Sequence, residues 1–267
     1  MLIIAGPCAL LPDKDRMTKL ATDLKEAGAD VFRAGVWKGG VFPPKDPKVW
    51  GPGAAGVAPL RATGFAAGLS VATEVRTPKH LDELARMPGA ASGGYAALGM
   101  VWTGARIMQA YDDVREIAAA AARMDIPFAI KRHPGSTLRD LLGIIAHVID
   151  SGYPEERLWV IERGTVSITY HDEVRWRPDP LAIAQVKETY PDVRVMGDAS
   201  HSVGRREYVF RMAMAYVAAG ADGLMIEVMD RPEDSPSDVR QCISVSEFAQ
   251  IAHLARQVET LTAKGEK

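Results

Sequence analysis

Short apolar runs alternate with amphipathic segments along the whole chain, and this alternation most constrains the fold. The runs are continuous rather than alternating in polarity, which is typical of parallel strands buried on both faces. We expect strands at 2–6, 30–35, 69–75, the end of 89–102, 127–132, 157–164, 193–201 and 221–228. Eight such strands, each followed by a helix, predict a single (β/α)8 barrel, the TIM barrel of the α/β class.

The amphipathic segments predict the helices that alternate with these strands. They cover 14–27, 54–68, 79–87, 112–125, 138–152, 180–191, 206–220 and 245–261. The 267 residues suit one such barrel, which takes roughly 250 residues. We expect the barrel to span 1–262, with a frayed tail at 263–267. Because the chain starts almost at the first strand and ends after the eighth helix, we expect no regulatory domain.

Composition argues against several classes of function. The formal net charge is −2, and no basic stripe indicates a nucleic-acid partner. No apolar stretch of ~20 residues could span a membrane, and no secretion signal is recognisable at the start. The two cysteines give no disulfide framework. We therefore expect a cytoplasmic protein without nucleic-acid or membrane partners.

Polar and charged residues gather where the predicted strands end. In barrels of this kind the catalytic residues lie at the carboxyl ends of the strands. Charges at the ends of buried strands are costly unless they are paired or used. The residues at these ends or in the loops after them are Cys8, Arg33, Lys38, Glu74, Arg106, Lys131, Glu162, Arg163, Asp198, His201, Glu227 and Asp238.

Four of these residues have side chains that bind metals. Cys8, His201, Glu227 and Asp238 combine one soft, one borderline and two hard ligands. This set suits a divalent transition metal with an open coordination position. Other interpretations stay open for each residue alone. Cys8 could be a small buried hydrophobe, His201 a satisfied polar residue, and Asp238 a helix N-cap.

Five cations converge on the same end of the predicted barrel. They are Arg33, Lys38, Arg106, Lys131 and Arg163. Without an anion they would repel one another, and arginine forks match phosphate or carboxylate geometry. The pattern favours a ligand that carries several negative charges, although Glu227 could simply pair with Lys131 or Arg163. His133 and His171 fall in predicted loops, where we expect solvated side chains.

The motifs resemble those of the synthases that condense phosphoenolpyruvate with an aldose phosphate. These are 3-deoxy-D-arabino-heptulosonate-7-phosphate (DAHP) synthase, the first enzyme of the shikimate pathway to aromatic amino acids, and 3-deoxy-D-manno-octulosonate-8-phosphate (KDO8P) synthase. The short DAHP synthase type is the more similar. The resemblance covers nearly the whole chain in order, through IAGPC, TEV, TGARIMQ, IKR, ERG, DASHSVGRREYV and AAGADGLMIEV followed by SD.

The resemblance implies roles for both groups of residues. It implies a divalent metal (Mn, Fe, Co or Zn) held by Cys8, His201, Glu227 and Asp238, which polarises the aldehyde. It implies phosphoenolpyruvate bound by Arg33, Lys38, Arg106, Lys131 and Arg163. Lys131, Cys8, His201 and Glu74 are the expected catalytic residues. The family also implies a homodimer or homotetramer.

The loop after Lys38 departs from both branches of the family. DAHP synthases continue with Pro-Arg-Thr-Ser and KDO8P synthases with Ala-Asn-Arg-Ser-Ser, whereas this chain reads KGGVFPPKDPKVWGPG. Lys45, Lys48 and Asp198 are therefore the expected acceptor-binding residues. We expect erythrose 4-phosphate as the acceptor. A KDO8P-type or specialised-pathway synthase with another aldehyde remains an alternative.

Two further hypotheses give the same barrel a different activity. A non-catalytic barrel could bind a phosphorylated metabolite, although the full set of metal-binding side chains argues against it. A Schiff-base aldolase could use Lys131 as its nucleophile. Trapping with borohydride distinguishes that chemistry from metal-dependent condensation.

Overall fold

A computed structural model describes residues 1–38, 51–86, 96–166 and 175–265. Within these residues, eight parallel strands follow one another around a closed barrel in chain order. The ring closes where the first strand pairs with the eighth, from Leu2 opposite Gly223 to Gly6 opposite Glu227. The strands are β1 (Leu2–Gly6), β2 (Val31–Arg33), β3 (Ser70–Val75), β4 (Leu98–Thr103), β5 (Phe128–Lys131), β6 (Leu158–Glu162), β7 (Arg194–Asp198) and β8 (Gly223–Met229).

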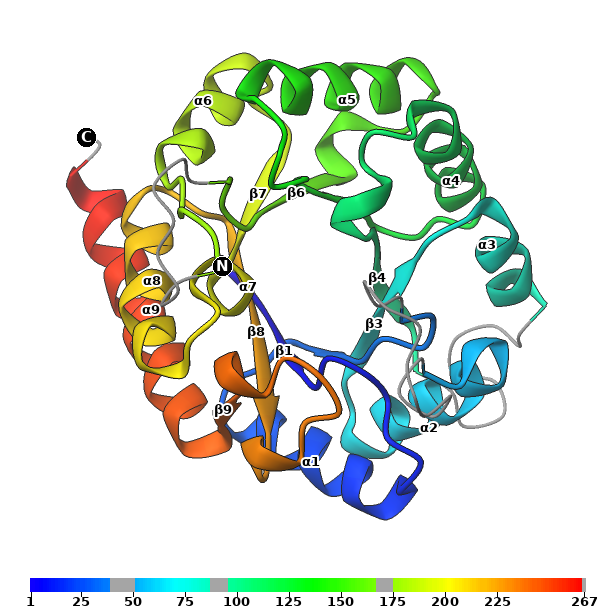
Figure 1. The fold of residues 1–267 in the computed structure, drawn as a ribbon, viewed down its shortest axis with the longest axis vertical. Coiled ribbons are helices and arrows are strands. Elements are labelled where there is room, and N and C mark those ends of the chain that lie inside the picture. Colours follow the sequence, from blue (N-terminus) through cyan, green and yellow to red (C-terminus); the bar gives the residue numbers. More distant parts are fainter. Residues whose placement is uncertain (39–50, 87–95, 167–174, 266–267) are drawn as a thin grey trace.

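A ring of helices surrounds these strands, as Figure 1 shows. Helices on the outside of the barrel link each strand of the ring to the next, and α9 follows the last strand, so the predicted (β/α)8 barrel is confirmed. None of the described helices has the length and hydrophobicity needed to cross a bilayer. The outer helices are α1 (Lys14–Glu26), α2 (Val57–Ala67), α3 (Pro78–Ala85), α4 (Tyr111–Arg123), α5 (Leu138–Asp150), α6 (Leu181–Thr189), α8 (Arg206–Ala218) and α9 (Val245–Gly265).

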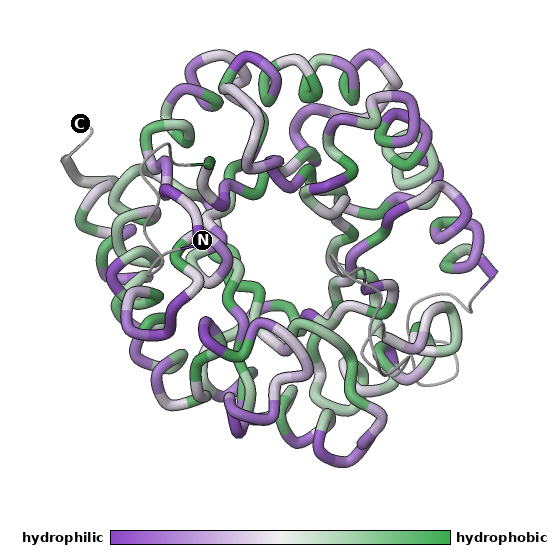
Figure 2. Tube along the Cα trace, in the orientation of Figure 1, coloured by the Kyte–Doolittle hydropathy of each residue, from purple (hydrophilic) through white to green (hydrophobic). Residues whose placement is uncertain are grey.

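Two hydrophobic layers stabilise this arrangement. The inner layer fills the barrel with side chains such as Ile4, Met100, Trp102 and Met225. The outer layer packs the strands against the apolar faces of the helices. Hydrophobic and hydrophilic residues accordingly alternate along the outer helices in Figure 2. The filled interior leaves the carboxyl ends of the strands as the place where polar side chains can gather.

The structure corrects the sequence-based prediction after β7. A strand was expected over 193–201, but β7 ends at Asp198 and a short helix, α7 (Ala199–Val203), follows. The reason is local, because the Asp198 carboxylate accepts the backbone N–H of His201 at 2.9 Å and caps that helix. His201 therefore lies on a helical turn at the barrel mouth rather than in the sheet.

Two smaller differences lie near the end of the chain. After β8 come the 3-10 turns η5 (Pro232–Asp234) and η6 (Val239–Gln241). A two-residue strand, β9 (Ile243–Ser244), then pairs with β8 outside the closed ring. The backbone of α9 is helical to Gly265, three residues beyond the expected end of the barrel at 262.

Candidate functional site

A cavity of about 490 Å³ opens at the carboxyl ends of the strands, and we call it the mouth cavity. It brings together side chains from every part of the barrel, as the strand-end pattern predicts. Nine of the residues singled out from the sequence line it: Cys8, Arg33, Lys38, Glu74, Arg106, Lys131, Arg163, His201 and Asp238. Glu227 and Asp198 do not line the cavity but contact the lining residues Arg33, His201 and Lys131. Lys45 and Lys48 fall outside the described residues.

The four predicted metal-binding residues form one compact group, the metal-ligand cluster. Ligand atoms of Cys8, His201, Glu227 and Asp238 all lie within 4.8 Å of one another. The closure of the barrel explains how they meet. Pairing of β1 with β8 sets Gly6 opposite Glu227, so Cys8 emerges beside that carboxylate. Asp238 begins η6, but its side chain makes no capping bond and instead accepts from the Cys8 thiol at 3.3 Å.

The hydrogen bonds around His201 favour a cation in this cluster. Asp198 Oδ2 lies 2.8 Å from His201 Nδ1, which places the ring proton on Nδ1. Burial lowers the pKa of His201, so the imidazole is neutral at pH 7. Its Nε2 then presents a lone pair to Glu227 Oε1, 3.3 Å away. Two acceptors at this distance without a proton between them are stabilised by a cation, and the donor set suits a divalent metal.

Electrostatics at Cys8 also fit a bound cation. Burial and the nearby Glu227 carboxylate raise the pKa of the Cys8 thiol to about 12. Lys38 lowers that pKa, and its ammonium contacts both the thiol and Ser237. A divalent ion would supply more positive charge than Lys38 and would stabilise the thiolate. Both cysteines of the chain are free, so Cys8 is available as a ligand.

The deeper cations of the mouth cavity have polar atoms without a hydrogen-bond partner in the described part of the chain. Arg33 and Arg163 are only 2% and 6% exposed. Arg33 reaches Glu227 with one nitrogen at 3.4 Å, while its Nε and Nη1 have no hydrogen-bond partner among the described residues. Arg163 has an unpartnered Nε and no ion pair within the described chain, and burial lowers its pKa to about 10. Buried donors without acceptors are costly, so an anionic ligand would complete this part of the site.

Lys131 differs from Arg163 because a close carboxylate already balances its charge. Its ammonium lies 2.5 Å from Asp198 Oδ2 and 3.5 Å from His201 Nδ1. Burial lowers the pKa of Lys131, while Asp198 opposes that shift. Asp198 is fully buried and faces both partners rather than the cavity. The carboxylate therefore orients a metal-ligand candidate and an anion-binding candidate at the same time.

Nearly the whole chain matches one known protein family. A family model described as the DAHP synthetase I family matches residues 1–264. The chain belongs to the DAHP synthetase I family. A relative in Thermotoga maritima, named phospho-2-dehydro-3-deoxyheptonate aldolase, is 29% identical over 251 residues, which is 93% of this chain and 67% of that protein. A 2-dehydro-3-deoxyphosphooctonate aldolase of Burkholderia multivorans is 25% identical over 213 residues, which is 74% of this chain and 68% of that protein.

Solved structures of DAHP synthase share the fold. The crystal structure of DAHP synthase from Thermotoga maritima superposes with a TM-score of 0.82 at 26% identity, over 98% of this chain and 69% of that one. A truncated form of the Thermotoga enzyme gives 0.79 at 25% identity, over 98% of this chain and 87% of that one. The chain is therefore a transferase that forms a carbon–carbon bond, as predicted.

The structure adds cavity residues that sequence reasoning missed. His133 was expected to be solvated but lines the mouth cavity, with Arg76 and Ser237 elsewhere on the wall. Arg175 and Trp176 also line it, although they lie thirteen and fourteen positions beyond the end of β6. A search confined to strand ends could not find these two residues. Their position depends on how the chain returns over the barrel.

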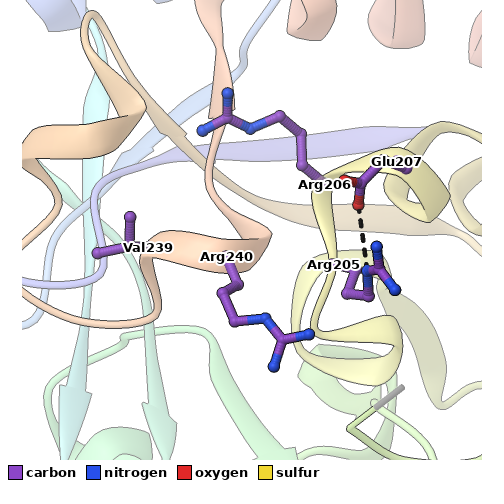
Figure 3. A pocket seen from close by; sticks show the side chains of 5 residues that line it. All are labelled: Arg205, Arg206, Glu207, Val239 and Arg240. Carbon is purple, nitrogen blue, oxygen red and sulfur yellow. Dashed lines mark ion pairs between the residues drawn. The ribbon is translucent and has the colours of Figure 1, made fainter. Parts of the chain in front are cut away.

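A second hollow of about 330 Å³ lies outside the mouth cavity, beside η6 and the start of α8. It is lined by Arg205, Arg206, Glu207, Val239 and Arg240, which Figure 3 shows. Arg205 pairs with Glu207 at 3.4 Å. The guanidinium groups of Arg206 and Arg240 point in different directions in Figure 3. These cations do not converge on one point, in contrast to the cations of the mouth cavity.

Proposed function

We propose that this member of the DAHP synthetase I family condenses phosphoenolpyruvate with an aldose phosphate and releases inorganic phosphate. The observation that carries the proposal is that Arg33 and Arg163 have buried guanidinium N–H groups with no partner among the described residues, in the same cavity as the metal-ligand cluster. Phosphoenolpyruvate carries a carboxylate and a phosphate and so supplies acceptors for these donors. The names of the relatives in both branches support this class of reaction.

The reaction balances with water as the third reactant. C3 of phosphoenolpyruvate attacks the aldehyde carbon, and the aldehyde oxygen takes a proton and becomes a hydroxyl group. Water adds at C2, and the C–O bond to phosphate breaks, which leaves a keto group at C2 and frees phosphate. Arg33, Arg163 and Lys131 would hold the carboxylate and phosphate in place during these steps, with Lys38 and Arg106 at the edge.

We assign Lys131 to donating a proton to the acceptor oxygen and Glu74 to orienting the water that is added. Burial lowers the pKa of Lys131, which makes the Nζ ammonium a stronger acid toward the acceptor oxygen. The Glu74 carboxylate lies against Gly104, where a Cβ would come within 2.3 Å of Glu74 Oε1. The missing side chain at Gly104 leaves room for that carboxylate in the cavity wall. We assign Glu74 to orienting the water that adds at C2.

The metal-ligand cluster fits a divalent Mn, Fe, Co or Zn ion. Cys8, His201, Glu227 and Asp238 would hold the ion, which would act as a Lewis acid toward the acceptor carbonyl. We assign Asp198 to orienting His201 and Lys131, because its carboxylate contacts both and does not line the mouth cavity. This assignment replaces the acceptor-binding role expected from the sequence.

Erythrose 4-phosphate is the proposed acceptor, with arabinose 5-phosphate as the alternative. The relatives include heptonate-forming and octonate-forming enzymes. The described cavity wall also contains Arg76 and His133. Arg76 is a cation that suits an acceptor phosphate. Lys45 and Lys48, the other proposed acceptor contacts, lie outside the described residues.

The test is phosphate release from phosphoenolpyruvate with a panel of aldehydes. The panel contains erythrose 4-phosphate, arabinose 5-phosphate and an unphosphorylated aldose, each with and without a metal chelator. We expect turnover with erythrose 4-phosphate and its loss in chelator. Binding of phosphoenolpyruvate without turnover of any aldehyde would instead indicate a non-catalytic barrel. A borohydride-trapped adduct on Lys131 would indicate Schiff-base chemistry.

A further inference from the structure

Residues 175–177 form a short segment at the edge of the mouth cavity, which Arg175 and Trp176 line, and we call it the rim segment. Its backbone is tied on both sides. Arg175 and Trp176 donate to Val203 and Ser202 carbonyls, each at 3.1 Å. Arg177 and Thr165 exchange two hydrogen bonds of 2.8 Å. The rim segment is therefore held between Thr165, which follows β6, and the end of α7.

Two glycines allow the rim segment to lie this close to the barrel. Gly164 has φ +86°, and a Cβ there would come within 2.8 Å of the Arg177 carbonyl and 3.0 Å of the Trp176 Cβ. Gly204 has φ +67°, and a Cβ there would lie 2.5 Å from the Arg175 Cβ. Both positions combine a left-handed backbone with a close approach, which only glycine accommodates without strain. The rim segment is thus built into the fold.

Trp176 contacts the anion-binding side of the mouth cavity. The Arg163 guanidinium carbon lies 5.4 Å from the centroid of the Trp176 ring. Arg163 has no ion pair within the described chain and an unpartnered Nε, so no carboxylate fixes its direction. A cation held over an indole face is stabilised by the ring quadrupole. Among the described residues, Trp176 is therefore a contact that can orient Arg163 before a ligand arrives.

Arg175, the preceding residue, contacts the metal-binding side. Its Nη1 donates to Asp238 Oδ1 at 2.7 Å and to Gln241 Oε1 at 3.2 Å. Gln241 in turn donates to Glu227 Oε2 at 2.6 Å. Asp238 has φ +59°, an uncommon conformation for a residue other than glycine, which neighbouring contacts must maintain. Arg175 thus reaches two of the four candidate ligands, one directly and one through Gln241.

We propose that Arg175 and Trp176 are a pair of positioning residues. Together they set the distance between the anion-binding part and the metal-binding part of the site. Trp176 holds Arg163 for the substrate anion, and Arg175 holds Asp238 and Gln241 for the metal. One peptide bond joins the two supports, so the separation of anion and metal is set by the rim segment. This inference rests on the proposed function, because it assumes that phosphoenolpyruvate and a divalent metal bind here.

The test measures the two ligands separately by calorimetry, without acceptor. We expect Trp176→Ala to weaken phosphoenolpyruvate binding about tenfold with unchanged affinity for Mn²⁺, and Trp176→Phe to restore part of the loss. We expect Arg175→Met to weaken Mn²⁺ binding by roughly 10- to 100-fold, as for residues that orient metal ligands, with phosphoenolpyruvate binding unchanged in metal-free protein. In turnover, Trp176→Ala should raise the KM for phosphoenolpyruvate more than it lowers kcat.

A matched control lies at the other end of the barrel. Arg194 stacks over Trp159 at 5.5 Å, so Arg194→Ala removes a similar pair far from the mouth and should alter neither affinity. Circular dichroism confirms that each variant is folded. If both rim variants lose both ligands equally, or neither loses any, the inference is wrong while the proposed function stands. If the wild-type protein binds no phosphoenolpyruvate, the proposed function fails and the inference fails with it.

Discussion

Asp198 holds His201 through two separate contacts, one to the backbone and one to the ring. Its Oδ1 accepts the backbone N–H of His201 at 2.9 Å, and its Oδ2 lies 2.8 Å from the ring Nδ1. The same carboxylate neutralises Lys131. One buried side chain thus determines the helical turn, the tautomer of a candidate metal ligand and the charge state of its neighbour.

Asp198→Asn should weaken both stability and metal binding in a protein that still folds. The amide keeps the shape but loses the charge, so the Lys131 ammonium is left buried and unpaired. We expect the free energy of unfolding to fall by about 3 kcal/mol and the affinity for Mn²⁺ to fall roughly 10- to 100-fold. Thermal unfolding and metal titration measure the two effects. Unchanged metal affinity in a folded variant would contradict the orienting role of Asp198.

The two cysteines offer a matched pair for testing the metal-ligand cluster. Cys8 and Cys242 are both buried and free, but only Cys8 belongs to the cluster. Cys8→Ala should abolish tight metal binding and turnover with little loss of stability. Cys242→Ala should keep both activities and lose ~1–2 kcal/mol of stability from the smaller core side chain. Equal metal content in the two purified variants would remove Cys8 from the proposed ligand set.

Metal affinity should depend on pH in a defined direction. The raised pKa of the Cys8 thiol, about 12, means that the folded protein holds this proton throughout the neutral range without metal. A metal that binds the thiolate must displace the proton, so apparent affinity should rise with pH, by about tenfold per unit. Titrations between pH 6 and 8 measure the slope. A slope as steep in Cys8→Ala as in the wild-type protein would assign the proton to another group.

Replacing either of two neighbouring buried arginines with an uncharged residue should have opposite effects on stability and on phosphoenolpyruvate binding. Arg163 has no carboxylate partner among the described residues, whereas Arg132 pairs with Glu162 at 2.7 Å and Asp179 at 2.9 Å. Arg163→Met should leave the melting temperature unchanged or higher while phosphoenolpyruvate binding weakens by about 10- to 100-fold.

Arg132→Met serves as the control for that variant. It should cost about 3–5 kcal/mol of stability, because Glu162 is left buried without its partner. At temperatures where the variant is folded, phosphoenolpyruvate binding should be close to that of the wild-type protein. Thermal melts and calorimetry decide the comparison. A large loss of stability in Arg163→Met would show that its charge serves the fold rather than a ligand.

The sequence was sufficient to predict the barrel and most of the mouth cavity, for a physical reason. Parallel strands must be apolar on both faces, so a polar residue at a strand end is conspicuous, and parallel strands deliver their ends to one place. Cys8, His201, Glu227 and Asp238 could therefore be grouped before their distances were known. The group is compact because β1 and β8 are neighbours in space.

The positions of Arg175, Trp176 and His201 could not be predicted, because they depend on contacts that no local sequence pattern encodes. Arg175 and Trp176 reach the cavity because Gly164 and Gly204 let the chain fold back closely, which is a tertiary effect. His201 was placed in a strand because apolar residues precede it, yet the Asp198 cap turns the chain there into a helix. In both cases a specific contact, rather than hydrophobic periodicity, decided the path of the backbone.

The pairing of β1 with β8, which closes the barrel, also has a consequence for synthesis of the protein. Cys8 leaves the ribosome early, while its three proposed co-ligands, His201, Glu227 and Asp238, emerge about 200 residues later. A nascent chain that stops short of those residues has one ligand and an open sheet. Metal binding would therefore coincide with the pairing of β8 with β1, and the ion would link the loop after β1 to the residues that follow β7 and β8.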